Sequence, residues 1–265
     1  MRIATYITTL NAIFWYSTLE QTIRSALEFS DGVAVLDGGS VDGTLDLLKR
    51  LQREYGEDKL VFEVKRCPYK QLGIMSSAWR KNNARELAKR AFKPDWLMLM
   101  DDDEVFLEKN AWTLRELCEK YLKSDVDAIW LGTYHFYRSW WRVHGPPFYE
   151  GKVYVTKNLP EIKHNKVGSD RDALTGYRKV ARHPEVKVYH YGWCRPDHVL
   201  AIKKFRQEID WWGVDYWRKH QFYPKFTNPE KLIPFKGEHP QVMQPLINEE
   251  WRWLPEFDER DTSLW

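Results

Sequence analysis

The chain has 265 residues with 41 basic and 38 acidic side chains, and its formal net charge of +3 gives no global field for binding nucleic acid. Three widely separated cysteines without metal-type spacing favour a reduced intracellular protein, and no apolar run is long enough to cross a membrane. We therefore expect a soluble, cytoplasmic protein without a nucleic acid partner or transmembrane segment, for which peripheral membrane contact stays open.

The first part of the chain alternates apolar runs with amphipathic stretches. Short apolar or β-branched runs predict strands at residues 3–9, 33–36, 60–64 and 96–100. Apolar residues at helical spacing predict helices between them, at residues 18–29, 45–55 and 76–92. Strands joined by helical crossovers are typical of parallel sheets, so we expect an α/β fold with a Rossmann-like, mostly parallel sheet flanked by helices.

Polar residues follow each of the four predicted strands. These residues are Thr8 and Thr9, Asp37, Lys65 with Arg66, and Asp101 with Asp103. The carboxyl ends of parallel strands meet at one edge of a sheet, and open α/β sheets bind their ligands there. The pattern therefore predicts one shared binding site.

The run Asp101-Asp102-Asp103 is the strongest chemical signal in the chain. It follows the continuously apolar residues 96–100, which are typical of a strand buried on both faces. Three adjacent carboxylates repel one another unless water or a hard cation such as Mg²⁺ or Mn²⁺ binds them. In extended geometry Asp101 and Asp103 point to the same side, which suits a shared cation. A solvated acidic loop that caps the following helix is the alternative.

A second informative stretch, rich in glycine, begins at Asp37. Gly38 and Gly39 allow a sharp turn and a close approach to a ligand, and the Asp37 carboxylate can accept hydrogen bonds from a base or ribose. A turn without any ligand uses the same residue types. This motif is informative only together with the others.

The second half of the chain has a mixed pattern. Apolar runs predict strands at residues 128–132, 153–156 and 186–189, and periodicity predicts helices at residues 112–122 and 199–218. The aromatic and basic segment 134–151 is typical of a loop over a site or of a plain hairpin. From residue 223 onward no periodicity is present, which indicates an extended C-terminal tail.

Aromatic residues are abundant, with 14 Trp, 14 Tyr and 12 Phe. Large aromatic side chains can stack on sugar rings or fill a core. Candidates for stacking in the second half are Tyr137, Trp140, Trp141 and Trp193.

Four motifs in the first 105 residues resemble the family 2 glycosyltransferases of the GT-A fold. Ile7-Thr-Thr-Leu-Asn11 resembles that family's Ile-Pro-Thr-Tyr-Asn, with Thr8 in place of the proline. Leu36-Asp-Gly-Gly-Ser-Val-Asp-Gly-Thr44 is similar to its Val-Asp-Asp-Gly-Ser-Thr-Asp-Gly-Thr, with Gly38 in place of the second Asp. Lys81-Asn82 corresponds to its Arg-Asn pair, and Asp101-Asp102-Asp103 to its Asp-x-Asp. Beyond Asp103, only the stretch from Val188 to Arg195 resembles a His-containing strand of some members.

This resemblance implies a glycosyltransferase of the hexosyl type. It would move a sugar with inversion from a nucleotide-diphosphate sugar to a saccharide, a lipid-linked acceptor or a protein. The implied organisation is a GT-A domain at 1–222, with a nucleotide-sugar-binding half at 1–105 and an acceptor half at 106–222. Residues 223–265 would form the C-terminal extension.

The resemblance also implies roles for individual residues. Donor-binding residues would be Thr8, Thr9, Asp37, Arg66, Lys81, Asp101 and Asp102. The Mn²⁺ or Mg²⁺ ligands would be Asp101, Asp103 and His190. Such a cation stabilises the negative charge that develops on the departing nucleoside diphosphate. A buried structural histidine is the alternative for His190.

Inversion requires a base that takes the proton of the acceptor hydroxyl in a single displacement. Asp170 and Asp172 are the first candidates, and Asp197 and Glu150 follow them. For each of these residues, a surface carboxylate without a catalytic role is the alternative.

Three other functions fit parts of the pattern. Asp101-x-Asp103 after an apolar strand also matches the nucleophile motif of haloacid dehalogenase type phosphotransferases, although that motif normally follows the first strand. A sugar-1-phosphate nucleotidyltransferase would need a Gly-rich, Arg-containing loop after the first strand, which is absent. A non-catalytic nucleotide-sugar or glycan-binding protein would keep the fold without turnover.

Overall fold

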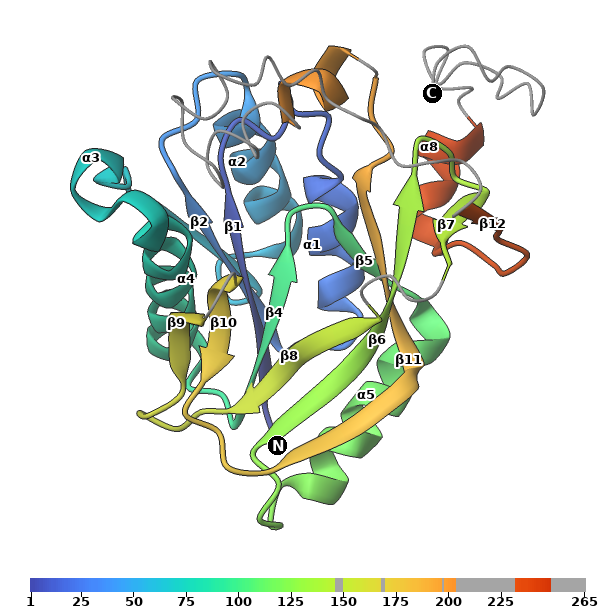
Figure 1. Ribbon diagram of the computed structural model, residues 1–265. Helices are drawn as coiled ribbons and strands as arrows, with labels where there is room; N and C mark the ends of the chain where they lie inside the picture. The colour runs from blue at the N-terminus through green and yellow to red at the C-terminus, as the bar shows by residue number, and fades with distance from the viewer. Residues whose placement is uncertain (146–149, 168–169, 197, 204–231, 249–265) are drawn as a thin grey trace.

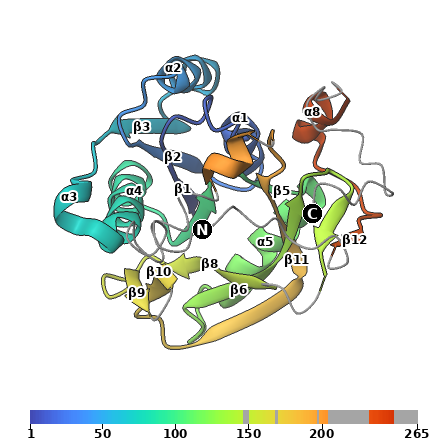
Figure 2. The same cartoon turned by 45° about the horizontal axis from the view of Figure 1, so that its top comes forward.

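One mixed sheet runs through the molecule, with helices on both faces and a separate hairpin beside it (Figures 1 and 2). This computed structural model describes residues 1–145, 150–167, 170–196, 198–203 and 232–248. No helix within these ranges is long and apolar enough to cross a membrane.

Four parallel strands form the N-terminal part of the sheet, in the order β3-β2-β1-β4. They are β1 (Ile3–Thr9), β2 (Gly32–Asp37), β3 (Leu60–Val64) and β4 (Trp96–Asp101). The register pairs Thr9 with Asp37 and Thr8 with Asp101, so these strands end at the same edge. The predicted parallel α/β arrangement is confirmed.

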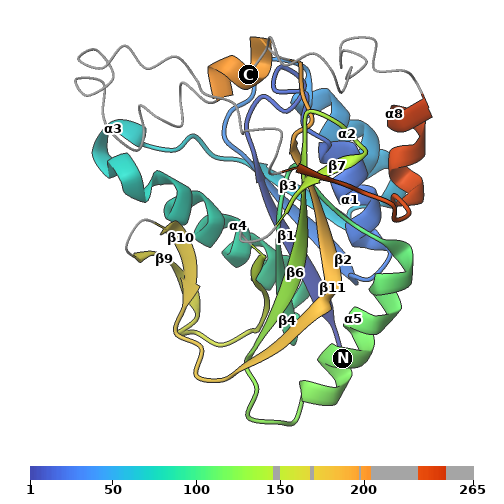
Figure 3. The same cartoon turned by 45° about the vertical axis from the view of Figure 1, so that its right-hand side comes forward.

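Helices cover both faces of the parallel strands (Figure 3). They are α1 (Leu19–Leu27), α2 (Thr44–Tyr55), α4 (Ser76–Phe92) and α5 (Glu108–Tyr121), with the short α3 (Tyr69–Leu72) and the 3-10 turn η1 (Gly73–Met75) before α4. Ile3 and Ile7 share one apolar cluster with α1, α2 and α5, whereas Tyr6 shares another with α4. This division follows because successive side chains of a strand point to opposite faces.

Beyond β4 the sheet becomes mixed. Its strands are β5 (Glu104–Phe106), β6 (Ala128–Tyr137), β7 (Arg142–His144), β8 (Gly151–Lys157), β11 (Val180–Trp193) and β12 (Leu232–Pro234). Strand β8 pairs antiparallel with both β4 and β6, while β11 runs parallel to β6 and antiparallel to β5. The β5–β11 pairing places the chain that follows Asp103 beside the end of β11.

A two-stranded hairpin lies outside this sheet. Strands β9 (Lys163–Val167) and β10 (Asp170–Thr175) pair only with each other among the described strands, and they lie beside α4 (Figures 1 and 3). The sequence patterns predict no strand in this polar stretch. Neither face of the hairpin is covered as completely as the faces of the central sheet, so charged side chains are tolerated on both faces. The alternation of apolar and polar residues that predicts a strand is therefore weak here.

The second half differs from prediction in other ways too. The predicted strands at 128–132 and 186–189 are parts of the longer β6 and β11, and segment 134–151 supplies the end of β6 and β7. Of the predicted helix 199–218, residues 199–203 are helical, in a helical segment that begins at residue 198, and the remainder lies outside the described residues.

The described part of the C-terminal extension packs against the sheet. Besides β12 it contains the 3-10 turn η3 (Gln241–Met243) and α8 (Gln244–Asn248). Phe235 and Met243 join a buried cluster with Phe136, Tyr189 and Tyr191 of β6 and β11. The predicted boundary at residue 222 lies outside the described residues and stays a prediction.

Candidate active site

A cleft of about 420 Å³ opens where β1 and β4 end. Its lining comes from the ends of these strands, from α4, from β10 and from the chain around the end of β11. The lining residues are Thr8, Thr9, Leu10, Trp15, Ser77, Arg80, Lys81, Asp101, Asp102, Asp103, Asp172, His190, Arg195 and Lys203. The acidic run and one of the two candidate bases therefore share one cleft.

The position of the acidic run follows from β4 and the strand after it. Residues 96–100 are buried, and Asp101 is the last residue of the strand. The Asp101 N–H donates to the Glu104 carboxylate at 2.8 Å, and the Ser17 hydroxyl donates to the Asp102 carbonyl at 2.5 Å. These bonds stabilise a tight turn that presents three successive carboxylates to the cleft.

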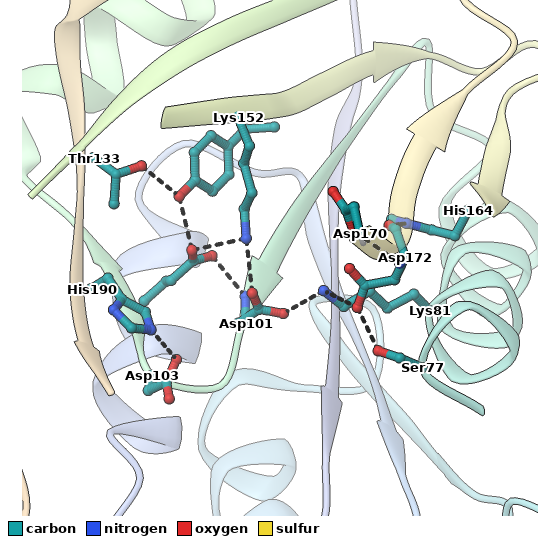
Figure 4. A network of polar contacts seen from close by, with 12 residues as sticks. Ser77, Lys81, Asp101, Asp103, Thr133, Lys152, His164, Asp170, Asp172 and His190 are labelled. Atoms are coloured by element: carbon teal, nitrogen blue, oxygen red, sulfur yellow. Dashed lines mark hydrogen bonds and ion pairs between the residues drawn. The ribbon is translucent and has the colours of Figure 1, made fainter. Parts of the chain in front are cut away.

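Two lysines neutralise the Asp101 carboxylate. Lys81 Nζ lies 2.8 Å from Oδ1, and Lys152 Nζ lies 2.8 Å from Oδ2 (Figure 4). Burial alone would raise the pKa of Asp101, but Lys152 and Lys81 hold this pKa well below its usual value. Asp101 is therefore ionised at neutral pH.

Lys152 also contacts a second buried carboxylate, that of Glu104. Its Nζ lies 3.0 Å from Glu104 Oε1, which also accepts a hydrogen bond of 2.8 Å from the Tyr154 hydroxyl (Figure 4). Burial raises the pKa of Glu104 to about 6. Glu104 thus contacts both Lys152 and the N–H of Asp101, and through them it stabilises the turn Asp101–Asp103.

Basic side chains from β11, from the chain that follows it and from the helical residues 198–203 surround Asp103. Arg195 donates to Oδ2 at 2.7 Å, Lys203 Nζ lies 3.4 Å from the same oxygen, and His190 Nε2 lies 3.4 Å from Oδ1. Burial opposes ionisation, but Lys203, His190 and Arg195 lower the pKa of Asp103. Burial, aided by Arg195, lowers the pKa of Lys203 to about 8.

Asp102 has a different environment from its neighbours. Its carboxylate accepts one hydrogen bond of 2.7 Å from the Thr9 hydroxyl. Burial, together with the negative charge of Asp103, raises the pKa of Asp102 to about 6. At neutral pH this carboxylate therefore retains a fraction of protonated species, unlike Asp101 and Asp103.

Asp172 reaches the cleft from β10. Its Oδ2 lies 3.0 Å from Lys81 Nζ and accepts a short hydrogen bond from the Ser77 hydroxyl (Figure 4). Burial by itself would raise the pKa of Asp172, but the Lys81 charge and the hydrogen bonds from Ser77 and Lys81 together lower it to about 2. Ser77 and Lys81 are four residues apart on α4 and so lie on one face of that helix. Asp170 does not line the cleft, and its Oδ1 accepts the N–H of Asp172 at 3.0 Å.

The Asp37 carboxylate is engaged by its own loop. Oδ1 accepts the N–H groups of Gly39 and Ser40 at 2.8 and 2.7 Å, and Oδ2 accepts the Ser40 hydroxyl at 2.5 Å. Asp37 and Arg66 are outside the set of cleft-lining residues. The chain around Gly39 has a left-handed φ of 96° and a Cβ there would meet the Arg66 side chain, so the loop needs glycine at this position. A donor contact by Asp37 or Arg66 stays a prediction.

Two of the three candidate metal ligands, Asp103 and His190, meet at one end of the cleft, whereas the carboxylate of the third, Asp101, contacts Lys81 and Lys152. Asp103 Oδ1 faces His190 Nε2, and the other ring nitrogen of His190 lies 3.1 Å from His135 Nδ1. Within the described residues no group of three or more Asp, Glu, His or Cys side chains forms a complete metal site. Divalent cations in phosphate-transfer sites commonly use one or two carboxylates and take their remaining ligands from substrate phosphates. The oxygen and nitrogen donors of Asp103 and His190 fit such a partial set.

The remaining candidates are distributed as follows. Glu150 is exposed, and Asp197 lies outside the described residues. Tyr137 and Trp140 are buried in the core, whereas Trp141 is 54% exposed. Neither of the two buried rings is available for stacking on a sugar in this conformation.

Several cleft residues have no counterpart among the sequence-based candidates: Trp15, Ser77, Arg80, Arg195 and Lys203. Lys152, which contacts Asp101 from outside the cleft lining, was not a candidate either. Ser77 lies one helical turn before Arg80 and Lys81 on α4, so the three side chains lie on the same part of the helix surface. This spacing was visible in the sequence. Among the described residues Arg80 has no carboxylate within ion-pair distance, so it is a cation available to an anionic ligand. Arg195 and Lys203 carried no local signal, because their partner Asp103 is far away in the sequence.

The model of glycosyl transferase family 2 matches residues 5–183. No curated protein matches the chain. Among solved structures, the mannosyltransferase PcManGT from Pyrobaculum calidifontis, in complex with GDP-Man and Mn²⁺, is similar with 15% identity and a TM-score of 0.50. That similarity covers 93% of this chain and 68% of the mannosyltransferase. At this identity it shows a shared fold, the GT-A fold.

The crystal structure of residues 1–349 of TarS from S. aureus also matches. The identity is 12% and the TM-score 0.47, with 72% of this chain and 60% of the TarS structure covered. A second TarS structure, in complex with UDP, has 16% identity and a TM-score of 0.36. The chain therefore spans less than two thirds of the TarS structures that it matches.

Proposed function

Since this chain belongs to glycosyl transferase family 2, we propose that it transfers a hexose from a nucleotide-diphosphate sugar to an acceptor hydroxyl with inversion. The observation that carries this proposal is the common cleft of Asp101, Asp103 and Asp172. One end of the cleft has the groups that a departing diphosphate needs, and the other has an ionised carboxylate suited to an acceptor. The mannosyltransferase is described with GDP-Man, which makes GDP-mannose the first donor to examine.

The charges of the cleft support a divalent cation as a partner of the donor. Its lining contains four carboxylates, Asp101, Asp102, Asp103 and Asp172, and four cationic side chains, Arg80, Lys81, Arg195 and Lys203. The negative and positive charges of these side chains nearly cancel. The negative charge of a bound diphosphate would therefore have no excess positive charge in the cleft to balance it. In our proposal Asp103 and His190, with Asp101 nearby, hold Mn²⁺ or Mg²⁺. The bound cation would supply positive charge next to the leaving diphosphate.

The cationic side chains act together with that site. Arg80 has no carboxylate partner among the described residues, and Lys203 and Arg195 lie on the Asp103 side of the cleft. As the bond between the anomeric carbon and the diphosphate oxygen breaks, negative charge grows on that oxygen. Preorganised cations stabilise this charge without rearranging, which lowers the barrier.

Asp172 is the proposed base. Its pKa of about 2 keeps it ionised, and it lines the cleft where Asp170 does not. In a single displacement the acceptor oxygen attacks the anomeric carbon, its proton passes to the Asp172 carboxylate, and the nucleoside diphosphate leaves from the opposite face. The low pKa makes Asp172 a weak base while Lys81 is 3.0 Å away. Its role is therefore to orient the hydroxyl and accept the proton late in the transfer.

A matched pair of variants tests this assignment. Asp172→Asn removes the proton acceptor, and Asp170→Asn changes the neighbouring carboxylate in the same way outside the cleft. We expect kcat for transfer from UDP- or GDP-sugars to fall by about 100- to 10000-fold in Asp172→Asn, and by less than about threefold in Asp170→Asn. Nucleoside diphosphate release with and without MnCl₂ provides the measurement.

The outcome separates three possibilities. Equal losses in both variants would contradict the choice of Asp172. Donor binding by the parent protein without any release of nucleoside diphosphate would favour the non-catalytic binding protein. Trapping of a phosphoryl group on Asp101 would instead support the haloacid dehalogenase alternative.

A further inference from the structure

The backbone of Asp172 is held by side chains instead of by a neighbouring strand. Between β9 and β10 the register runs from Asp170 opposite Val167 to Ala173 opposite Asn165, so the ladder is interrupted at Asp172. The Asp172 N–H donates to Asp170 Oδ1 at 3.0 Å. Its carbonyl accepts the Nδ1–H of His164 at 2.6 Å. An extra residue in a ladder has no cross-strand partner of its own, and here side chains replace that partner.

The tautomer of His164 follows from these partners. A carbonyl oxygen only accepts, so Nδ1 carries the proton, and Nε2 accepts the Tyr6 hydroxyl at 2.8 Å. The ring is 1% exposed and makes an edge contact with the Tyr6 ring. The imidazole therefore links the Asp172 backbone directly to β1, which carries Thr8 and Thr9 at the cleft.

The backbone of His164 is fixed as well. Its N–H donates to Asn82 Oδ1 at 2.8 Å, and Asn82 Nδ2 donates to its carbonyl at 2.9 Å. Asn82 follows Lys81 on α4, and Lys81 contacts the Asp172 carboxylate. His164 is thus held on one side by α4 and on the other by β1, and both of these elements contribute residues to the lining of the cleft.

We propose that His164 is a positioning residue, which fixes the Asp172 carboxylate at the cleft through the Nδ1–H bond to the Asp172 carbonyl (Figure 4). This inference rests on the proposed function, because it gives His164 its role through the base Asp172. Without the bond, Asp172 keeps its side-chain contacts to Ser77 and Lys81 and the bond from its N–H to Asp170, a residue of the same hairpin strand. A base displaced by about 1 Å can cost about 100-fold in rate, so loss of this bond should lower kcat.

Two amide substitutions separate this role from mere burial of a ring. In His164→Asn the amide N–H occupies roughly the position of Nδ1 and can donate to the Asp172 carbonyl, but it cannot reach Tyr6. In His164→Gln the longer amide reaches the position of Nε2 and can accept from Tyr6, but it leaves the Asp172 carbonyl without a donor. Each variant therefore loses one hydrogen bond. His164→Asn loses the bond to Tyr6, and His164→Gln loses the bond to the Asp172 carbonyl.

We expect kcat to fall by about 30- to 100-fold in His164→Gln and by less than about fivefold in His164→Asn. The donor KM should stay within about twofold in both variants, because the donor groups lie on the Asp103 side. In an Asp172→Asn background, His164→Gln should have no further effect on kcat. If His164→Gln does not fold, Tyr6→Phe provides a second test, with an expected loss in kcat of about fivefold that Asp172→Asn again abolishes.

Distinct results overturn distinct claims. Equal kcat losses in the Asn and Gln variants, or losses that persist in the Asp172→Asn background, would show that His164 acts only on the fold. Full kcat in His164→Gln, in a protein that Asp172→Asn inactivates, would overturn the positioning role and leave the proposed function standing. Full transfer by Asp172→Asn would overturn the base assignment itself, and the role of His164 with it.

Discussion

The two acidic regions of the cleft are held in place in different ways. The turn Asp101–Asp103 directly follows a buried strand in the middle of the sheet, and backbone pairing fixes where it begins. Asp172 lies in an interrupted hairpin outside that sheet, and side chains of β1, β9 and α4 fix its position.

This difference shows which substitutions should damage chemistry and which should damage geometry. In the acidic turn, removing a carboxylate changes the charge while the strand keeps its place. At the hairpin, changing a side chain that never touches the cleft should move the carboxylate that does. Lys81 belongs to both regions, because it contacts Asp101 and Asp172.

Apart from removal of the base Asp172, the largest effect is expected from removing a charge of the acidic turn. Asp103→Asn keeps the shape of the side chain but removes the negative charge that faces His190, Arg195 and Lys203. We expect transfer to fall about 1000-fold and its dependence on Mn²⁺ to disappear. Steady-state transfer measured over a range of MnCl₂ concentrations, and after EDTA treatment, checks this result.

Asp102→Asn is the matched control for that variant. The pKa of Asp102 is already raised to about 6, and its carboxylate accepts one bond from Thr9 that an amide oxygen also accepts. We expect a loss below about tenfold. If Asp102→Asn were as damaging as Asp103→Asn, the two carboxylates would act as one unit, and the metal assignment would need revision.

Lys81→Met affects both regions at once. The partly buried carboxylates of Asp101 and Asp172 would each lose their contact at about 3 Å with the buried Lys81 ammonium, and the two losses together cost about 3 kcal/mol of unfolding free energy. We expect kcat to fall about 100-fold as well, because both acidic groups lose their orientation. Lys89→Met on the same helix removes an ion pair of 2.7 Å with Glu86 and should cost less than about 1 kcal/mol. Equal effects of the two variants in urea unfolding and in transfer would contradict the bridging role of Lys81.

A pair of smaller changes compares the two modes of support directly. Asn82→Ala removes both hydrogen bonds to the His164 backbone, and we expect a cost of about 2 kcal/mol in unfolding free energy and about tenfold in kcat. Ser17→Ala removes one bond to the Asp102 carbonyl, and we expect about 1 kcal/mol with kcat nearly unchanged. A larger kcat loss in Ser17→Ala than in Asn82→Ala would reverse the comparison.

The last comparison concerns the pH dependence of stability. Burial, aided by the Lys81 charge, lowers the pKa of His164 to about 3, so the folded state prefers the neutral ring. The stabilisation of the folded state by the neutral His164 ring is complete above the pKa of an unfolded histidine, about 6.5. It is lost as the pH falls from about 6.5 toward 3. Between pH 7 and pH 5 it amounts to about 2 kcal/mol of unfolding free energy.

His164→Asn should remove that part of the pH dependence, which urea unfolding at pH 7 and pH 5 will measure. His198→Asn replaces an exposed histidine and serves as the control. A parent protein and a His164→Asn variant that lose the same stability between these pH values would show that His164 is not neutral in the fold.

Much of the first half could be predicted because its signals are local. Apolar runs of four to seven residues fix the strands, and glycine, proline and helix periodicity fix what lies between them. Asp101 and Asp103 were found in the same way, since an acidic run after a buried strand must emerge at the sheet edge. The hairpin β9–β10 was missed because alternation is weak in a polar, half-exposed pair of strands.

The sequence by itself determined the α/β order, the glycosyltransferase motifs and the place of the acidic turn, because each depends on residues within one strand, turn or helix. The tertiary structure alone decided that Asp172 lines the cleft and Asp170 does not, and that Arg195 and Lys203 neutralise Asp103. It also decided that His164 contacts Asp172 and Tyr6. Charge pairing and hydrogen bonding act over a few ångströms in space, and residues more than 90 positions apart meet only after the sheet has formed.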